Sequence, residues 1–145
     1  MSVTVGIKKL HPDARIPVYA TPGSAGLDLC TLEAFVLRGG SGRTVKTGLS
    51  VAIPEGFEGQ VRSRSGLASK FAVAVLNSPG TIDCDYRGEV CVLLYNHSDL
   101  EWNFKAGDRI AQLVICPVVQ ARLVEDENLF TETERGAGGF GSTGK

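Results

Sequence analysis

The sequence contains no CxxC pair and no closely spaced histidines, which argues against a structural zinc site. It also has no N-terminal apolar segment of the signal-peptide type and no run of about 18 or more apolar residues that could span a membrane. We therefore expect a cytoplasmic protein without a membrane partner. Its four cysteines are expected to stay reduced and to pack as small hydrophobic side chains.

The sequence also lacks an excess of positive charge. Fifteen basic and 16 acidic residues leave a formal net charge of −1. Proteins bind long nucleic acids through basic surfaces that displace counterions, so we expect no nucleic-acid partner. The same balance is compatible with a small anionic ligand, which needs only a few well-placed arginines.

What the sequence does contain is a series of strand-like runs. Its 145 residues, 43% of them hydrophobic, suit one globular domain. Runs rich in Val, Ile and Leu are separated by glycine or proline, and TVKTGLSVAI alternates as a strand over a core does. Only SGLASKF predicts a helix, with Ser65 as its N-cap. The pattern predicts an all-β sandwich or barrel over residues 1–124 and a polar C-terminal segment over 125–145.

Two motifs in the first half of the chain place charge where packing alone does not need it. AGLDL sets Asp28 between two leucines, either as a strand-end residue facing water or as part of a site. RSRSGLA places arginines and serines at the start of the predicted helix, where backbone N–H groups and guanidinium groups can bind an anion. A capped surface helix explains the second motif equally well.

Two further motifs follow in the second half. NSPGTIDCDYRG predicts a strand and a turn followed by two acids, a tyrosine and an arginine. This tip is either solvated or, as we favour, carries a general base beside a platform for a ring. GDRIAQL places Gln112 within an apolar strand, where its amide needs a structural partner or a ligand.

The chain ends in RGAGGFGSTGK, which is rich in glycine. GFGSTGK matches part of a mononucleotide-binding loop, but no Ser or Thr follows Lys145 and no parallel strand precedes the segment, so we exclude that class. Its glycine N–H groups and hydroxyls can still contact phosphate. A disordered terminus without a role is the alternative.

The order, spacing and wording of these five motifs resemble those of the homotrimeric dUTPases, and NSPGTID resembles the bacterial form. The resemblance implies a jelly-roll or distorted β-barrel subunit with one short helix and a flexible C-terminal arm. It further implies a homotrimer whose active sites are shared between chains. One departure is Ser63, where the family commonly has proline.

The resemblance also implies hydrolysis of dUTP to dUMP and pyrophosphate, which keeps uracil out of DNA and supplies dUMP for thymidylate synthesis. By this reading Asp83 is the general base and orients water for in-line attack on the α-phosphorus. Mg²⁺ is the implied cofactor, held by the phosphates and contacted by Asp28 through water only.

The residues implied to bind substrate fall into three groups: a uracil and sugar pocket, a set of phosphate contacts, and a closing arm. Tyr86 would lie against deoxyribose and Phe140 would stack on uracil. The full set comprises Arg64, Ser65, Gly66, Asn77, Gly80, Thr81, Ile82, Asp83, Tyr86, Cys91, Gln112, Arg135, Phe140, Gly141, Ser142 and Thr143.

Two alternatives stay open at this stage. A dCTP deaminase shares the implied fold, but those enzymes carry a catalytic glutamate on the strand after the aspartate-bearing loop, where this chain reads CVLLY. A non-catalytic trimeric nucleotide-sensing protein is the second alternative, and loss of the base or of the arm would be its expected mark.

Overall fold

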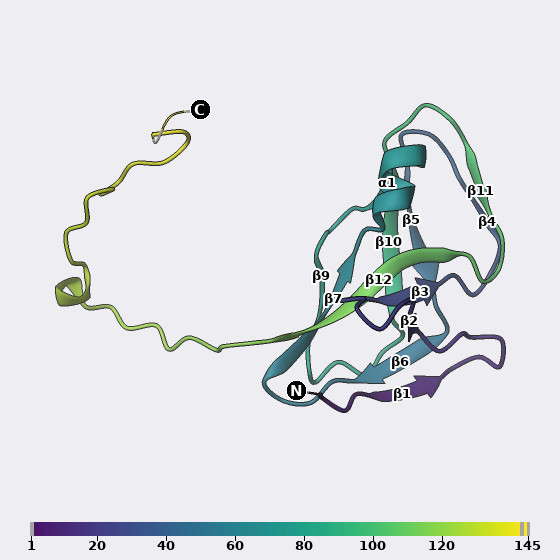
Figure 1. The fold of residues 1–145 in the computed structure, drawn as a ribbon, viewed down its shortest axis with the longest axis horizontal. Helices are drawn as coiled ribbons and strands as arrows, with labels where there is room; N and C mark the ends of the chain where they lie inside the picture. The colour runs from purple at the N-terminus through teal and green to yellow at the C-terminus, as the bar shows by residue number, and fades with distance from the viewer. Residues whose placement is uncertain (1, 143, 145) are drawn as a thin grey trace.

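The computed structural model describes residues 2–142 and 144, which form twelve strands, one α-helix and one short 3-10 helix (Figure 1). Many strands are short and end at glycine- or proline-containing turns, as the spacing of the apolar runs predicts. The elements are β1 (Gly6–Lys9), β2 (Val18–Tyr19), β3 (Leu27–Cys30), β4 (Phe35–Leu37), β5 (Gly42–Lys46), β6 (Leu49–Ala52), β7 (Phe57–Arg62), α1 (Ser65–Phe71), β8 (Val73–Val75), β9 (Gly80–Ile82), β10 (Cys91–Asn96), β11 (Trp102–Phe104), β12 (Arg109–Pro117) and the 3-10 helix Glu127–Leu129.

The strands form four antiparallel sheets. The largest has the order β2-β3-β12-β7-β9, and a second has the order β5-β10-β8. Two-stranded pairs, β1-β6 and β11-β4, complete the barrel. In the described part of the chain, no helix is long and apolar enough to cross a membrane.

The core lies between these sheets and is built from the inward-facing residues of nearly every strand. Leu29, Leu49, Leu94, Ile110 and Leu113 are each at most 2% exposed. Burying such side chains is the dominant favourable contribution to folding, at about 1.5–3 kcal/mol each. This apolar centre fixes which faces of β3, β7, β9 and β12 remain outside for polar side chains.

The run TVKTGLSVAI does not form one strand, which corrects the sequence-based expectation. Thr47 and Gly48 separate β5 from β6, and β5 pairs with β10 whereas β6 pairs with β1. Gly48 has φ +70°, and a Cβ there would come within 2.9 Å of the Ala14 Cβ. The chain therefore needs glycine at the point where it changes sheets.

The helix begins where predicted, but Ser65 is not its N-cap. Arg64 occupies the cap with extended backbone angles, φ −87° and ψ 128°, and no side chain caps the helix. Ser65 is instead the first residue inside the helix. The predicted helix SGLASKF is otherwise confirmed from Ser65 to Phe71.

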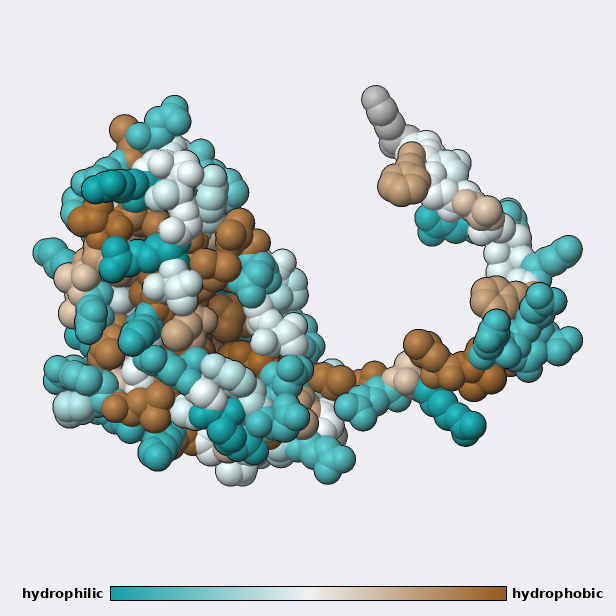
Figure 2. Space-filling view, turned by 180° about the vertical axis from the view of Figure 1, so that it is seen from behind, coloured by the Kyte–Doolittle hydropathy of each residue, from teal (hydrophilic) through white to brown (hydrophobic). Residues whose placement is uncertain are grey.

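The C-terminal segment leaves the barrel after β12 and runs away from it as an extended chain (Figure 1). The Val118 N–H still donates to the Gly56 carbonyl at 2.8 Å. Beyond that point apolar residues lie open to solvent, as Figure 2 shows along the arm; Leu123 is 92% exposed and Phe130 is 85% exposed. The segment therefore buries little against its own barrel.

Candidate active site

The loop that follows β9 carries the candidate base. Ile82 is buried, and because side chains alternate along a strand, Thr81 and Asp83 point to the opposite, exposed face. Both line a cleft of about 670 Å³ together with Glu58 and Asp85. Asp83 thus presents its carboxylate to open space at the end of a strand whose other face is anchored in the core.

The predicted uracil pocket lies at the other end of β9, in the turn that joins it to β8; these two strands do not pair, because β8 pairs with β10 and β9 with β7. Asn77 is exposed in the turn between β8 and β9, and a Cβ at Gly80 would lie 3.2 Å from its Nδ2 atom. The structure therefore brings the Asn77 amide against the bare backbone of Gly80. Tyr86 follows in the next loop with 45% of its surface exposed.

Cys91 begins β10 opposite Lys46 of β5 and is exposed. Partial burial raises the pKa of its thiol, the Glu89 carboxylate raises it further, and Lys46 opposes both. The thiol is therefore protonated at neutral pH. An uncharged side chain here suits contact with a neutral base.

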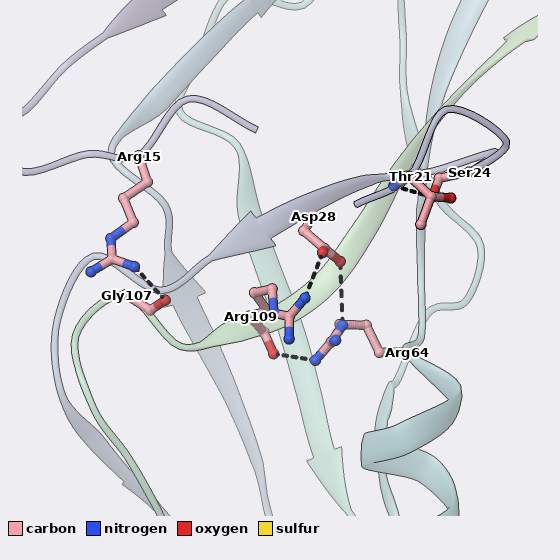
Figure 3. A network of polar contacts seen from close by, with 7 residues as sticks. All are labelled: Arg15, Thr21, Ser24, Asp28, Arg64, Gly107 and Arg109. Atoms are coloured by element: carbon pink, nitrogen blue, oxygen red, sulfur yellow. Dashed lines mark hydrogen bonds and ion pairs between the residues drawn. The ribbon is translucent and has the colours of Figure 1, made fainter. Parts of the chain in front are cut away.

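A network of one aspartate and two arginines forms the second part of the candidate site (Figure 3). Asp28 of β3 is buried, and its Oδ2 accepts a hydrogen bond from Arg109 Nη1 at 3.2 Å. Arg64, from the segment between β7 and α1, places Nε 3.3 Å from Asp28 Oδ1 and donates from Nη1 to the Arg109 carbonyl at 3.0 Å. Among the described residues, Asp28 Oδ1 is buried and has this ion-pair contact but no hydrogen bond.

Gln112 joins this network through the register of the sheet. It lies on β12 opposite Asp28 of β3 on one side and Arg62 of β7 on the other. A Cβ at Gly26 would lie 3.0 Å from the Gln112 Cβ and 3.4 Å from its Cδ. Strand pairing therefore unites AGLDL, RSRSGLA and GDRIAQL in one region of the surface.

The base and the arginine network do not meet within one chain. Ile82, next to Asp83, pairs with Gly59, whereas Gln112 pairs with Arg62, three residues further along β7. At about 3.3 Å per residue the two rows are about 10 Å apart along the strands, and β7 separates β9 from β12 across the sheet. The five motifs thus form separate groups on one subunit.

The arm residues form a third group, remote from the other two. Phe140 is fully exposed, and the Arg135 side chain donates from Nε to the Gly138 carbonyl at 2.8 Å within the arm itself. Gly141 has φ +90°, and the Ser142 N–H donates to the Gly139 carbonyl at 3.0 Å. Thr143, also predicted to contact phosphate, lies outside the described residues.

Sequence reasoning did not single out Arg109, which holds Asp28 in the site. Arg109 lies in GDRIAQL, but its contact with Asp28 spans 81 positions and depends on the pairing of β3 with β12. Ser63, where proline is common in the resembling family, has a role of its own: its Oγ accepts a hydrogen bond from the Val75 N–H at 2.8 Å.

The described residues contain no group of three or more His, Cys, Asp or Glu side chains that could hold a metal ion. A metal cage made by protein side chains alone does not fit the described surface. Asp28 Oδ1 lacks a hydrogen bond but is buried 3.3 Å from Arg64 Nε, so a metal-bound water can reach it only after the Arg64 side chain moves.

Comparisons with known proteins identify one family. A family model described as dUTPase matches residues 12–144. The deoxyuridine 5'-triphosphate nucleotidohydrolase of Nautilia profundicola is 55% identical over 139 residues, covering 96% of this chain and 97% of that protein. The protein of the same name from Anaeromyxobacter sp. strain Fw109-5 is 53% identical, and the match covers all of both chains.

Solved structures agree with these relatives. The dUTPase of Staphylococcus bacteriophage 80alpha, a mutant solved with dUpNHpp, has a TM-score of 0.91 and 30% identity, covering 99% of this chain and all of that one. A mutant dUTPase from phage phi11 of S. aureus has a TM-score of 0.80 and 27% identity, covering 86% of this chain and 97% of that one, and is described with a structural Mg(II) ion. The predicted fold class is confirmed, and the chain belongs to the dUTPase family.

Proposed function

We propose that this protein hydrolyses dUTP to dUMP and pyrophosphate in the cytoplasm, which keeps uracil out of DNA and supplies dUMP for thymidylate synthesis. The observation that carries this proposal is the match of residues 12–144 to the dUTPase family model. The deaminase alternative is disfavoured because β10 reads CVLLYN and has no acid. The non-catalytic alternative is disfavoured because both the base and the arm are present.

Asp83 is the proposed general base. Its carboxylate is exposed at the end of β9, where it can accept a proton from a water aligned with the α-phosphorus. General-base catalysis of this kind contributes about 10²–10⁴-fold to rate. The water attacks phosphorus, the bond to the bridging oxygen breaks, and pyrophosphate leaves with the electron pair.

The segment over residues 77–91 is the proposed nucleoside pocket. Main-chain groups from Gly80 to Asp83 and near Cys91 read the edge of uracil, with help from the Asn77 amide. A tight pocket rejects the thymine methyl by steric overlap and rejects cytosine because its donors and acceptors do not match. Tyr86 lies against the deoxyribose and leaves no room for a 2′-hydroxyl.

The phosphate contacts are proposed to come from a second chain of a homotrimer. Arg64, Ser65, Gly66 and Gln112 form the group that the sheet register separates from Asp83 in one chain. A second copy that docks this group against the segment over residues 77–91 makes a complete site. The separation of the two groups within the subunit is what supports sharing between chains.

The arm over residues 125–145 is proposed to close over a neighbouring site. Phe140 stacks on uracil, Arg135 anchors the arm or meets phosphate, and Gly141, Ser142 and Thr143 hold the γ-phosphate. Ordering about ten residues costs on the order of 10 kcal/mol in backbone freedom. Only triphosphate contacts together with stacking offset this cost, so the arm orders when substrate is bound.

Mg²⁺ is the proposed cofactor, bound by the substrate phosphates. When bound it neutralises charge on the triphosphate. The chain's own contribution is Asp28: its Oδ2 holds Arg109, and its Oδ1, which lacks a hydrogen bond, can accept one from a metal-bound water once the Arg64 side chain moves away. The described residues therefore suit a metal ion that binds together with the substrate phosphates.

The decisive experiment measures pyrophosphate release from dUTP, dTTP, dCTP and UTP with Mg²⁺. We expect rapid release from dUTP and poor release from the other three. Release from dCTP or UTP at the rate for dUTP would contradict the proposed pocket. Absence of release from dUTP in a folded preparation would contradict the proposed function itself.

A further inference from the structure

Tyr86 lies directly over Gly88. A Cβ built on Gly88 would lie 2.6 Å from Tyr86 Cζ and 3.0 Å from Cε2, and it would also overlap the phenol oxygen. Distances this short are not compatible with any side chain unless the ring moves. The whole outer end of the ring therefore occupies the space that a side chain at position 88 would fill.

The phenol oxygen is held as well as the ring. Tyr86 Oη donates a hydrogen bond to the Glu89 carbonyl at 3.0 Å, one residue beyond the glycine on which the ring lies. The tyrosine is nevertheless 45% exposed, so one face of the ring remains available for a ligand. Packing on Gly88 and the bond to Glu89 together define where that exposed face lies.

Gly88 and the Glu89 carbonyl together form the seat of the Tyr86 ring, and the segment that carries this seat is fixed to the barrel. Ser50 Oγ donates to the Arg87 carbonyl at 2.7 Å, and the Glu89 carboxylate accepts from the Gly48 N–H at 2.9 Å. The Val90 N–H donates to the Leu49 carbonyl at 2.7 Å. Contacts at Arg87, Glu89 and Val90 therefore tie the segment to the β5–β6 connection and to β6.

We propose that Gly88 is a positioning residue for sugar selection, and that it acts by letting the Tyr86 ring lie against the fixed backbone of residues 88 and 89. The inference rests on the proposed function, in which Tyr86 faces the deoxyribose. A side chain at position 88 displaces the ring from its seat. The ring then no longer defines the space beside C2′, so discrimination against a 2′-hydroxyl falls.

The test compares kcat/KM for dUTP and UTP in Gly88→Ala, Tyr86→Ala and the wild type. We expect the dUTP-to-UTP ratio to fall by about tenfold or more in Gly88→Ala, the range that steric pockets supply. Gly23→Ala is the matched control, because a Cβ at Gly23 meets nothing within 4 Å. Its ratio is expected to equal that of the wild type.

Tyr86→Phe provides a second variant, which keeps the ring and removes only the bond to the Glu89 carbonyl. We expect its ratio to fall by about two- to tenfold, the effect of one hydrogen bond. This variant tests the seat even where Gly88→Ala does not fold. A ratio unchanged in both Gly88→Ala and Tyr86→Phe, with Tyr86→Ala altered, overturns the inference alone.

A ratio unchanged in all three variants overturns the inference and the proposed sugar contact of Tyr86 together. Failure of the wild type to hydrolyse dUTP overturns the proposed function and, with it, the inference. The double variant Tyr86→Ala/Gly88→Ala adds a further check, because the ring that the new methyl would displace is gone. We expect Gly88→Ala to have little additional effect on stability in that background.

Discussion

Asp28 holds Arg64 across two different elements of the barrel: its Oδ1 lies 3.3 Å from the guanidinium Nε, while its Oδ2 accepts a hydrogen bond from Arg109. The Asp28 side chain is only 7% exposed, compared with 24% for Arg64 and 55% for Arg109. A buried carboxylate therefore sets the position of two more exposed cations. This relationship gives Asp28 a role in orienting the proposed phosphate contacts.

We expect Asp28→Asn to weaken dUTP binding and to destabilise the fold by about 1.5–3 kcal/mol, the range for a hydrogen bond to a charged group. The change removes the negative charge that holds both arginines but keeps the side chain's size. Urea unfolding and the KM for dUTP are the measurements.

Asp13→Asn is the control for this substitution. Asp13 is 80% exposed and lies 3.7 Å from His11 Nδ1, so its loss is expected to change stability by less than about 0.5 kcal/mol. Equal effects of the two substitutions would contradict the role assigned to the Asp28 network.

The second prediction concerns the proposed base. Asp83→Asn keeps the size and shape of the side chain but cannot accept the proton, so kcat is expected to fall at least about 10²-fold while dUTP binding largely survives. Steady-state kinetics and equilibrium binding of dUTP separate the two effects. Near-normal turnover in a pure preparation would show that another group is the base.

The third prediction follows from the raised pKa of the Cys91 thiol. A higher pKa means less thiolate at a given pH, so alkylation at about pH 8 is expected to be slower than for an unperturbed thiol and to keep rising with pH above the ordinary thiol pKa. The tryptic peptide from Gly88 to Lys105 contains Cys91 as its only cysteine, so mass spectrometry isolates its rate.

Two substitutions are expected to change the alkylation rate of Cys91 in opposite directions. Glu89→Gln removes a carboxylate that raises the pKa of Cys91, so alkylation is expected to become faster. Lys46→Gln removes a cation that lowers it, so alkylation is expected to become slower. Changes of the same sign in the two variants would contradict an electrostatic cause.

The sequence was sufficient to predict the all-β class and the helix, because β-branched runs and glycine or proline turns are local signals. It was not sufficient for strands of two or three residues such as β2 and β4, which are too short to show a period. The break at Gly48 was missed because the apolar alternation continues through it, and only pairing with two different sheets reveals the turn.

The candidate site shows the same limit. Asp28, Arg64 and Gln112 were identified one by one from their motifs, whereas Arg109 was not, because its role depends on a contact across the β3–β12 pairing. Gly88 ends the motif NSPGTIDCDYRG but was not singled out there. Its importance arises from the ring that packs over it, which no local pattern specifies.

The last prediction tests the proposed sharing of sites between chains. Deleting residues 135–145 is expected to leave the barrel and its assembly intact, because the arm buries little against its own chain. Activity is expected to collapse, since base stacking alone contributes about 1–3 kcal/mol and the phosphate contacts are lost with it. The truncated chain keeps Asp83, and the Asp83→Asn chain keeps its arm.

Refolding these two inactive variants together discriminates the two arrangements. If the base and the arm reach one site from different chains, some mixed trimers contain a complete site and activity returns. If each chain serves only its own site, every site in every mixed trimer lacks either the base or the arm. Each variant refolded alone is the control, and mass spectrometry of the intact assemblies verifies mixing. An inactive mixture that contains mixed trimers would therefore exclude the crossing arm, because a crossing arm would give some of those trimers a complete, active site.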